Sequence, residues 1–70
     1  MKRRRVQSSA IRSIGYDAEA QAIEVEFVNG RIYRYLDVPE FLHRGFTLAS
    51  SKGEYFRRRI NNRFRCEEVR

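Results

Sequence analysis

Residue types from which enzyme sites are built are scarce in this 70-residue sequence. The single cysteine, Cys66, excludes an internal disulfide and a cysteine-rich metal site, and it suits a reducing cytoplasm. The single histidine, His43, has no neighbour in the sequence that would orient it as a general base, so we interpret it as a solvated surface residue. Because no catalytic set of residues is present, we expect a protein that is not an enzyme and that needs no cofactor and no metal.

Long hydrophobic runs are also missing. No segment is long enough to cross a bilayer. The basic residues at the start are followed by Val6-Gln7-Ser8-Ser9, where a signal peptide would have an apolar run of at least about seven residues. We therefore expect a cytoplasmic protein with no membrane partner.

Acidic residues are outnumbered, and the excess positive charge lies at the two ends of the chain. The formal net charge is +6. Residues 1–5 contain four basic residues and no acidic one, and residues 50–70 contain seven basic and three acidic residues, whereas residues 6–49 contain four basic and six acidic ones. Such a distribution attracts polyanions such as RNA or DNA. A solubilising surface with a disordered tail explains it equally well.

Length and charge define the expected domains. A chain of this length forms one domain and buries only about 60% of its unfolded surface, so a deep enclosed active site is not expected. Residues 1–7 are predicted to be a flexible basic arm, because the adjacent charges of Lys2, Arg3, Arg4 and Arg5 cannot be buried. Residues 8–70 are predicted to form the folded domain.

Hydrophobic patterns predict three strands. A first strand is expected around Ile11 and Tyr16, between two polar stretches. Residues 22–27 alternate strictly between apolar and charged side chains, which is typical of a half-buried strand. Residues 31–35 form the third strand.

The second and third strands are joined by a turn at Asn29-Gly30, residues that tolerate the positive φ of a tight turn. A two-residue turn would place Arg34 beside Val25 on the buried face. A three-residue loop of Val28-Asn29-Gly30 instead pairs Val25 with Tyr33, and we favour this register.

The three-residue loop also decides which side chains face the core. Under this register Glu24 lies opposite Arg34 on the outer face. Ile23 lies opposite Tyr35, so Tyr33 and Tyr35 face the core rather than forming an exposed platform for base stacking.

Two short helices follow the strands. Pro39 suits the first helical position, and an amphipathic helix is predicted over residues 39–49. Six residues are expected on its apolar side: Phe41, Leu42, Gly45, Phe46, Leu48 and Ala49. Ser51 and Glu54 have the spacing of a capping box, which starts a second helix with an apolar stripe of Phe56, Ile60 and Phe64. The fold class is therefore α+β, with a three-stranded antiparallel meander followed by two short helices on one face (β-β-β-α-α).

The second helix also carries the candidate binding residues. At about 100° per residue, three cations align in one strip beside two polar neighbours: Lys52, Arg59, Arg63, Tyr55 and Asn62. Arg58 and Arg65 are expected on the opposite side. Cations next to an aromatic ring and an amide suit a phosphate backbone with an unstacked base, and Arg3, Arg4 and Arg5 of the arm would add phosphate contacts. A solvated arginine-rich helix face explains the same pattern without any ligand.

Seven short segments also occur in an order and spacing typical of one family. They are Ser8-Ser9, Ile14-Gly15-Tyr16-Asp17, Val25-Glu26-Phe27 with Gly30, Tyr33-Arg34-Tyr35, Val38-Pro39, Ala49-Ser50-Ser51-Lys52-Gly53, and Tyr55-Phe56 with Ile60. Together they resemble the KTSC domain family, from Ser8 to about Phe64. Arg57 and Cys66 depart from the family, which often has asparagine and an aromatic residue at these places.

The resemblance implies an α+β domain of unestablished function, named after a C-terminal extension of some lysyl-tRNA synthetases and also found as stand-alone bacterial and phage proteins. RNA binding is proposed for the family because of that fusion, which is an association and not a physical argument. Of the residues that recur in the family, Lys52 is the best suited to contact a ligand.

Two functional hypotheses result. The first is a small accessory module that binds nucleic acid, RNA rather than DNA, through the basic helix face and the arm. The second is a protein-interaction module or a homodimer with no nucleic-acid role, because a three-stranded sheet leaves two open edges.

Overall fold

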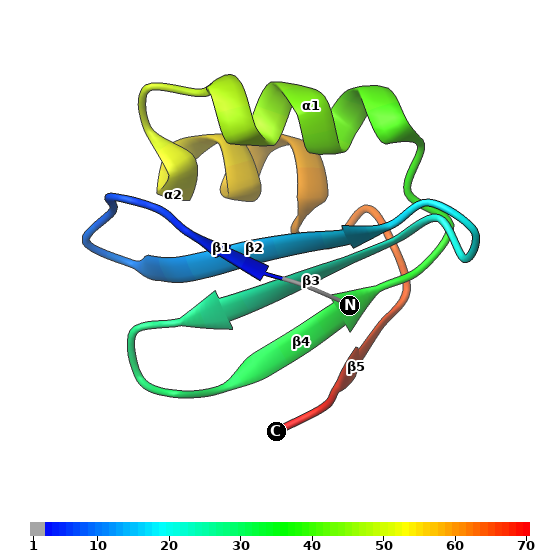
Figure 1. The fold of residues 1–70 in the computed structure, drawn as a ribbon, viewed down its shortest axis with the longest axis horizontal. Coiled ribbons are helices and arrows are strands. Elements are labelled where there is room, and N and C mark those ends of the chain that lie inside the picture. Colours follow the sequence, from blue (N-terminus) through cyan, green and yellow to red (C-terminus); the bar gives the residue numbers. More distant parts are fainter. Residues whose placement is uncertain (1–2) are drawn as a thin grey trace.

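Five antiparallel strands form one sheet in the computed structural model, which describes residues 3–70 (Figure 1). Their order in the sheet is their order in the chain. They are β1 (Arg3–Arg5), β2 (Ile11–Asp17), β3 (Ala22–Phe27), β4 (Ile32–Tyr35) and β5 (Cys66–Glu68). The α+β class is thereby confirmed, and the predicted meander corresponds to β2, β3 and β4. The prediction of three strands is corrected to five.

The first additional strand changes the interpretation of the basic arm. Arg3–Arg5 pairs with β2, with Arg3 opposite Gly15. The Arg3 guanidinium donates from Nη1 to Glu24 Oε1 at 2.6 Å and from Nε to Ser13 Oγ at 3.2 Å. The charge of Arg3 thus has partners within the fold, and Arg3–Arg5 forms a strand where the sequence predicted a flexible arm. Lys2 lies outside the described residues.

The second additional strand, β5, extends the sheet beyond β4. Arg34 lies opposite Glu67. Backbone hydrogen bonds on both sides of β5 hold it beside β4. Leu36 N donates to Arg65 O and Ile32 N donates to Arg70 O, both at 2.9 Å. All three residues of β5 are exposed, so the segment has no apolar alternation by which a strand could be predicted.

The register predicted for the hairpin is confirmed. Val25 lies opposite Tyr33, and Glu24 lies opposite Arg34. The loop is closed by Gly30 N, which donates to Phe27 O at 2.9 Å. Tyr35 is buried in the core as expected, and its burial raises the pKa of its phenol to about 12. This side chain is therefore a neutral part of the core.

Gly30 has a φ of +91°, a backbone conformation that side chains with a Cβ rarely adopt. Replacing it by alanine is expected to lower the free energy of unfolding by about 1 kcal/mol, because of backbone strain alone, since nothing lies within 4 Å of the added Cβ. Gly53→Ala is the matched control. Gly53 lies within α2 (Lys52–Tyr55), and a Cβ added there would contact only the Cβ of Ala10, at 3.7 Å. Because alanine favours a helix more than glycine does, the free energy of unfolding should be unchanged or higher. Urea unfolding followed by circular dichroism measures both, and equal losses would contradict this account of Gly30.

Both helices lie on the same face of the sheet (Figure 1). The first is α1 (Glu40–Leu48), with Pro39 as its N-cap, so the helix begins one residue later than predicted. The second begins as α2 (Lys52–Tyr55) and continues as a π-helical turn, η1 (Phe56–Ile60). Ser51 Oγ accepts from Glu54 N at 3.3 Å, as expected for a helix N-cap.

The core lies between the sheet and the two helices. Phe46 of α1 and Ile60 of η1 are completely buried. Phe56 contacts Phe27, Tyr35 and Phe46, with ring centroids 5.3, 5.5 and 6.4 Å apart. Phe56 and Ile60 of the predicted stripe therefore face the sheet, whereas Phe64 lies beyond the end of η1 and is half-buried.

The apolar side predicted for α1 is partly wrong. Phe41 is 67% exposed and Leu48 is 78% exposed, whereas His43 is half-buried. At about 100° per residue, His43 is only about 60° from the buried Phe46 around the helix, and Phe41 is about 140° away. The helix thus turns its His43 side, rather than its Phe41 side, toward the sheet.

Candidate functional site

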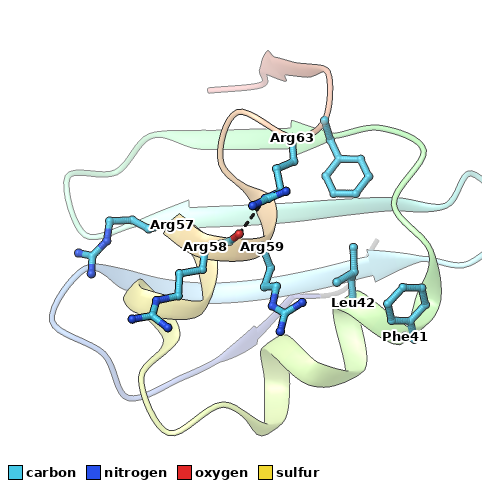
Figure 2. Close-up of a pocket in the computed structure, with 7 residues that line it drawn as sticks. Phe41, Leu42, Arg57, Arg58, Arg59 and Arg63 are labelled. Atoms are coloured by element: carbon cyan, nitrogen blue, oxygen red, sulfur yellow. Dashed lines mark hydrogen bonds between the residues drawn. The ribbon is translucent and has the colours of Figure 1, made fainter.

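A broad hollow lies between α1 and the turn η1 (Figure 2). It has a volume of about 730 Å³ and is open to solvent. Its lining consists of four arginines and three apolar residues: Arg57, Arg58, Arg59, Arg63, Phe41, Leu42 and Phe64. We refer to it as the arginine hollow.

The π-helical turn places three consecutive arginines in solvent. Phe56 and Ile60 are buried at its two ends, and Asn61 N donates to Phe56 O at 2.8 Å, which closes the wide turn. The three arginines between them, residues 57–59, are all exposed. Figure 2 shows Arg59 pointing toward α1 and Arg57 extending the other way.

Arg63 returns to this surface from beyond the helix. Its Nε donates to the backbone oxygen of Arg58 at 2.8 Å, and its own N donates to Ile60 O at 3.2 Å (Figure 2). These bonds orient the guanidinium while leaving its terminal nitrogens available to a ligand.

The arginine hollow is strongly electropositive. No acidic residue is among its lining residues. In residues 3–70, the one ion pair made by its arginines joins Arg58 Nη2 to Glu54 Oε2 at 3.8 Å. Both side chains of this pair are exposed, so the attraction is weak and leaves most of the positive charge uncompensated.

Exposed aromatic surface lies beside these charges. Phe41 belongs to the lining and is 67% exposed, so much of its ring is open to solvent. Leu42 and Phe64 are half-buried next to it. The arrangement therefore offers guanidinium groups for anions and apolar surface for a flat ring.

The structure brings together only part of the predicted site. Arg59 and Arg63 line the arginine hollow together. Lys52 instead lines a separate hollow with Ser51, and Asn62 is exposed in the turn after η1 with a φ of +63°. Only Arg57 lines both hollows.

Tyr55 has a packing role in the structure. Its hydroxyl donates to Leu42 O at 2.9 Å, and its ring stacks on Phe46 with centroids 5.4 Å apart. A Cβ at Gly45 would overlap the Tyr55 hydroxyl, so the glycine allows α1 to approach this ring closely. Tyr55 thus joins the two helices, and it lines a neighbouring hollow with Arg58 and Arg59 rather than the arginine hollow itself.

The arginines of the predicted arm lie elsewhere. Arg3 is on the outer face of the sheet, paired with Glu24. Arg4 lines another hollow beside His43, and Arg5 is exposed at the edge of the sheet. None of them lines the arginine hollow.

Sequence reasoning missed Phe41, Arg57 and Arg58. The projection at about 100° per residue assumed a regular α-helix, and it placed Arg58 on the side away from the strip of Lys52, Arg59 and Arg63. The wider π-helical turn changes this angle. The three consecutive arginines, residues 57–59, were the available sequence signal for this surface. The helical projection assigned them to different sides of the helix.

His43 is not the solvated residue that the sequence indicated. Its ring stacks on Tyr16 with centroids 4.8 Å apart and an interplanar angle of 11°. Burial lowers the pKa of His43, while the nearby Glu40 acts in the opposite direction. Tyr16 in turn donates its hydroxyl to Val38 O at 2.8 Å. This pair anchors α1 to β2.

Neither a metal-binding cluster nor a membrane-spanning helix is found in residues 3–70. No three His, Cys, Asp or Glu side chains in that range are grouped closely enough to hold a metal ion. No helix in the same range has the length and apolar content needed to cross a membrane.

Comparisons with known proteins identify relatives of the chain. A family model described as the KTSC domain matches residues 7–64. The crystal structure of a KTSC domain protein from Yersinia pestis superposes with a TM-score of 0.94 and 41% sequence identity, over 99% of this chain and 97% of that one. A protein of Stutzerimonas stutzeri is 48% identical over 56 residues, which are 80% of this chain and 79% of that protein.

A lysine–tRNA ligase of Nostoc punctiforme is 30% identical over 63 residues, or 90% of this chain. The chain spans 11% of the length of that ligase, so it corresponds to a small part of the enzyme.

Proposed function

Because the chain belongs to the KTSC domain family, we propose that it is a non-catalytic accessory module that binds single-stranded RNA through the arginine hollow. The observation that carries this proposal is the composition of the hollow. Four arginines and an exposed phenylalanine line one open surface, and no carboxylate is among them.

Guanidinium groups match the backbone of RNA. Arginine presents several N–H donors in a planar fork that fits two phosphate oxygens at once, and it stays charged at any physiological pH. Arg57, Arg58 and Arg59 extend in different directions from η1 (Figure 2). They are therefore suited to successive phosphates along a strand rather than to one small anion.

Phe41 supplies a surface for an unpaired base. Stacking of a base on an aromatic side chain contributes about 1–3 kcal/mol per base and requires that the base be free of its own helix. A strand with its phosphates on η1 would bring a base toward Phe41 across the hollow. This favours single-stranded RNA, such as a loop or an end, over a duplex.

The relatives add support of a different kind. The name lysine–tRNA ligase states that the Nostoc punctiforme enzyme acts on a tRNA, and the matching segment is 11% of its length. An added domain on such an enzyme would meet RNA routinely. This is an argument from association, and the arginine hollow supplies the physical one.

Binding should depend strongly on salt. If three or four arginines each contact one phosphate, the logarithm of the association constant should fall against the logarithm of salt concentration with a slope of about −2 to −3. Fluorescence anisotropy of a labelled, unstructured RNA of about 12 nucleotides at several salt concentrations measures this slope. A slope near zero, or the absence of binding at low salt, would contradict the proposal.

A protein-interaction role is the second candidate, and the sheet edges favour one form of it. The edge strand β1 is Arg-Arg-Arg, and the opposite edge strand β5 is Cys-Glu-Glu. Opposite charges on the two edges would allow β1 of one copy to pair with β5 of the next. Sedimentation velocity over a range of protein concentrations distinguishes this role, since it predicts a rising mass with no response to RNA.

A further inference from the structure

A second hollow lies beside the first, where the connection between β1 and β2 meets the connection between α1 and α2. It has a volume of about 360 Å³. Hydroxyl and cationic side chains dominate its lining: Ser8, Ser9, Ser50, Ser51, Lys52 and Arg57. We refer to it as the serine–lysine hollow.

Two of its serines are set up as hydrogen-bond donors. Ser8 Oγ accepts from the backbone N of Ala10 and of Ile11, each at 3.2 Å, so both of its lone pairs are used. Ser51 Oγ accepts from Glu54 N at 3.3 Å. Each hydroxyl keeps its hydrogen to donate, so these two serines favour a ligand that accepts hydrogen bonds.

Two cations strengthen this preference. Lys52 Nζ donates to Ala49 O, which holds the half-buried side chain in place and leaves two of its three N–H donors for a ligand. Arg57 is exposed and makes no ion pair within residues 3–70. The hollow thus combines donors and positive charge from three separate segments of the chain.

Glu54 is the one acidic residue of the lining. Its carboxylate lies 3.8 Å from Arg58 Nη2. Arg58 lines the arginine hollow and not the serine–lysine hollow. Even with the charge of Glu54 counted in full, Lys52 and Arg57 leave the hollow with net positive charge.

We propose that the serine–lysine hollow binds a phosphate group. A phosphate offers acceptor oxygens only, and it carries the negative charge that the two cations favour. Because Arg57 lines both hollows, a strand bound in the arginine hollow would carry a phosphate around Arg57 and into the serine–lysine hollow. That the phosphate belongs to an RNA strand rests on the proposed function, whereas the phosphate site itself does not.

The test is an NMR titration of the full chain, labelled with ¹⁵N, at constant ionic strength. The probes are inorganic phosphate, and one RNA of about six nucleotides with either a 5′-phosphate or a 5′-hydroxyl. Phosphate should shift the amide signals of Ser8, Ser9, Ser51 and Gly53. Lys52→Gln should weaken phosphate binding by about tenfold, the effect of losing one charge-assisted contact. Arg44→Gln, which removes the same charge from a residue of neither hollow, should leave it unchanged.

The outcomes separate this inference from the proposed function. RNA that shifts residues 57–63 but not the serines, together with no response of the serines to inorganic phosphate, would overturn the phosphate site and leave RNA binding intact. Phosphate shifts that Lys52→Gln removes, with no binding of either RNA, would support the phosphate site and overturn its RNA source. A stronger serine shift with the 5′-phosphate than with the 5′-hydroxyl would identify the hollow as a site for a strand end, and equal shifts would identify an internal phosphate.

Discussion

Phe46→Ala is expected to lower the free energy of unfolding by about 3–5 kcal/mol, enough to leave much of the protein unfolded at 25 °C. Phe46 is completely buried between the helices and the sheet. Its ring stacks on Tyr55 and lies against Phe56, with centroids 5.4 and 6.4 Å apart. Truncation would remove both contacts and leave a cavity that a small domain has little spare stability to tolerate.

Phe41→Ala is the matched control, because it deletes the same atoms from the same helix. Phe41 is 67% exposed, so its loss should change stability by no more than about 1 kcal/mol. Urea unfolding followed by circular dichroism gives both values. If Phe46→Ala lowered the free energy of unfolding no more than Phe41→Ala does, α1 would not have Phe46 toward the sheet and Phe41 toward solvent.

The pair of substitutions Arg59→Gln and Arg63→Gln is expected to lower affinity for single-stranded RNA by at least about tenfold. Each guanidinium lost removes a charge-assisted hydrogen bond to a phosphate. The salt slope should also become shallower by about 1.4, because each phosphate contact contributes about 0.7 on a single strand. Anisotropy titrations of the same labelled RNA measure both changes.

Arg12→Gln with Arg44→Gln is the control for net charge. Arg12 is paired with Glu26 at 3.8 Å and Arg44 with Glu40 at 3.2 Å, and neither lines the arginine hollow. If binding depended only on total charge, the two double variants would lose affinity equally. That result would remove the arginine hollow as the site.

The hairpin was predictable because local chemistry and side-chain pairing agree there. Gly30 supplies a residue that accepts positive φ, and only the three-residue loop keeps Arg34 away from Val25. Strict alternation over residues 22–27 then decides which face is buried. These signals depend on residues that are close together in the sequence, so they can be interpreted without knowledge of the rest of the fold.

The two edge strands could not be predicted in this way. Arg3–Arg5 becomes ordered because Glu24 and Ser13, distant in the sequence, provide partners for Arg3. β5 is exposed and held by backbone hydrogen bonds to the segment around β4. Neither strand has an apolar pattern, so tertiary contacts decide their structure.

The candidate site was predicted in part for a similar reason. Arg59 and Arg63 line one hollow, but Phe41 comes from another helix, and Arg57 and Arg58 lie on the π-helical turn. Lys52 was assigned to the same surface, whereas the structure places it in the serine–lysine hollow. A projection of one regular helix cannot anticipate a change of helix type within it.

The most direct test of RNA binding at the arginine hollow is a map of shifted signals. We expect titration of the ¹⁵N-labelled protein with unstructured RNA, at two salt concentrations, to shift the amide and arginine Nε–H signals of residues 57–59 and 63 and the amide of Phe41. These shifts should diminish at the higher salt concentration. Shifts confined to the outer face of the sheet, around Arg3 and Arg34, or no shifts at either salt concentration, would contradict the account.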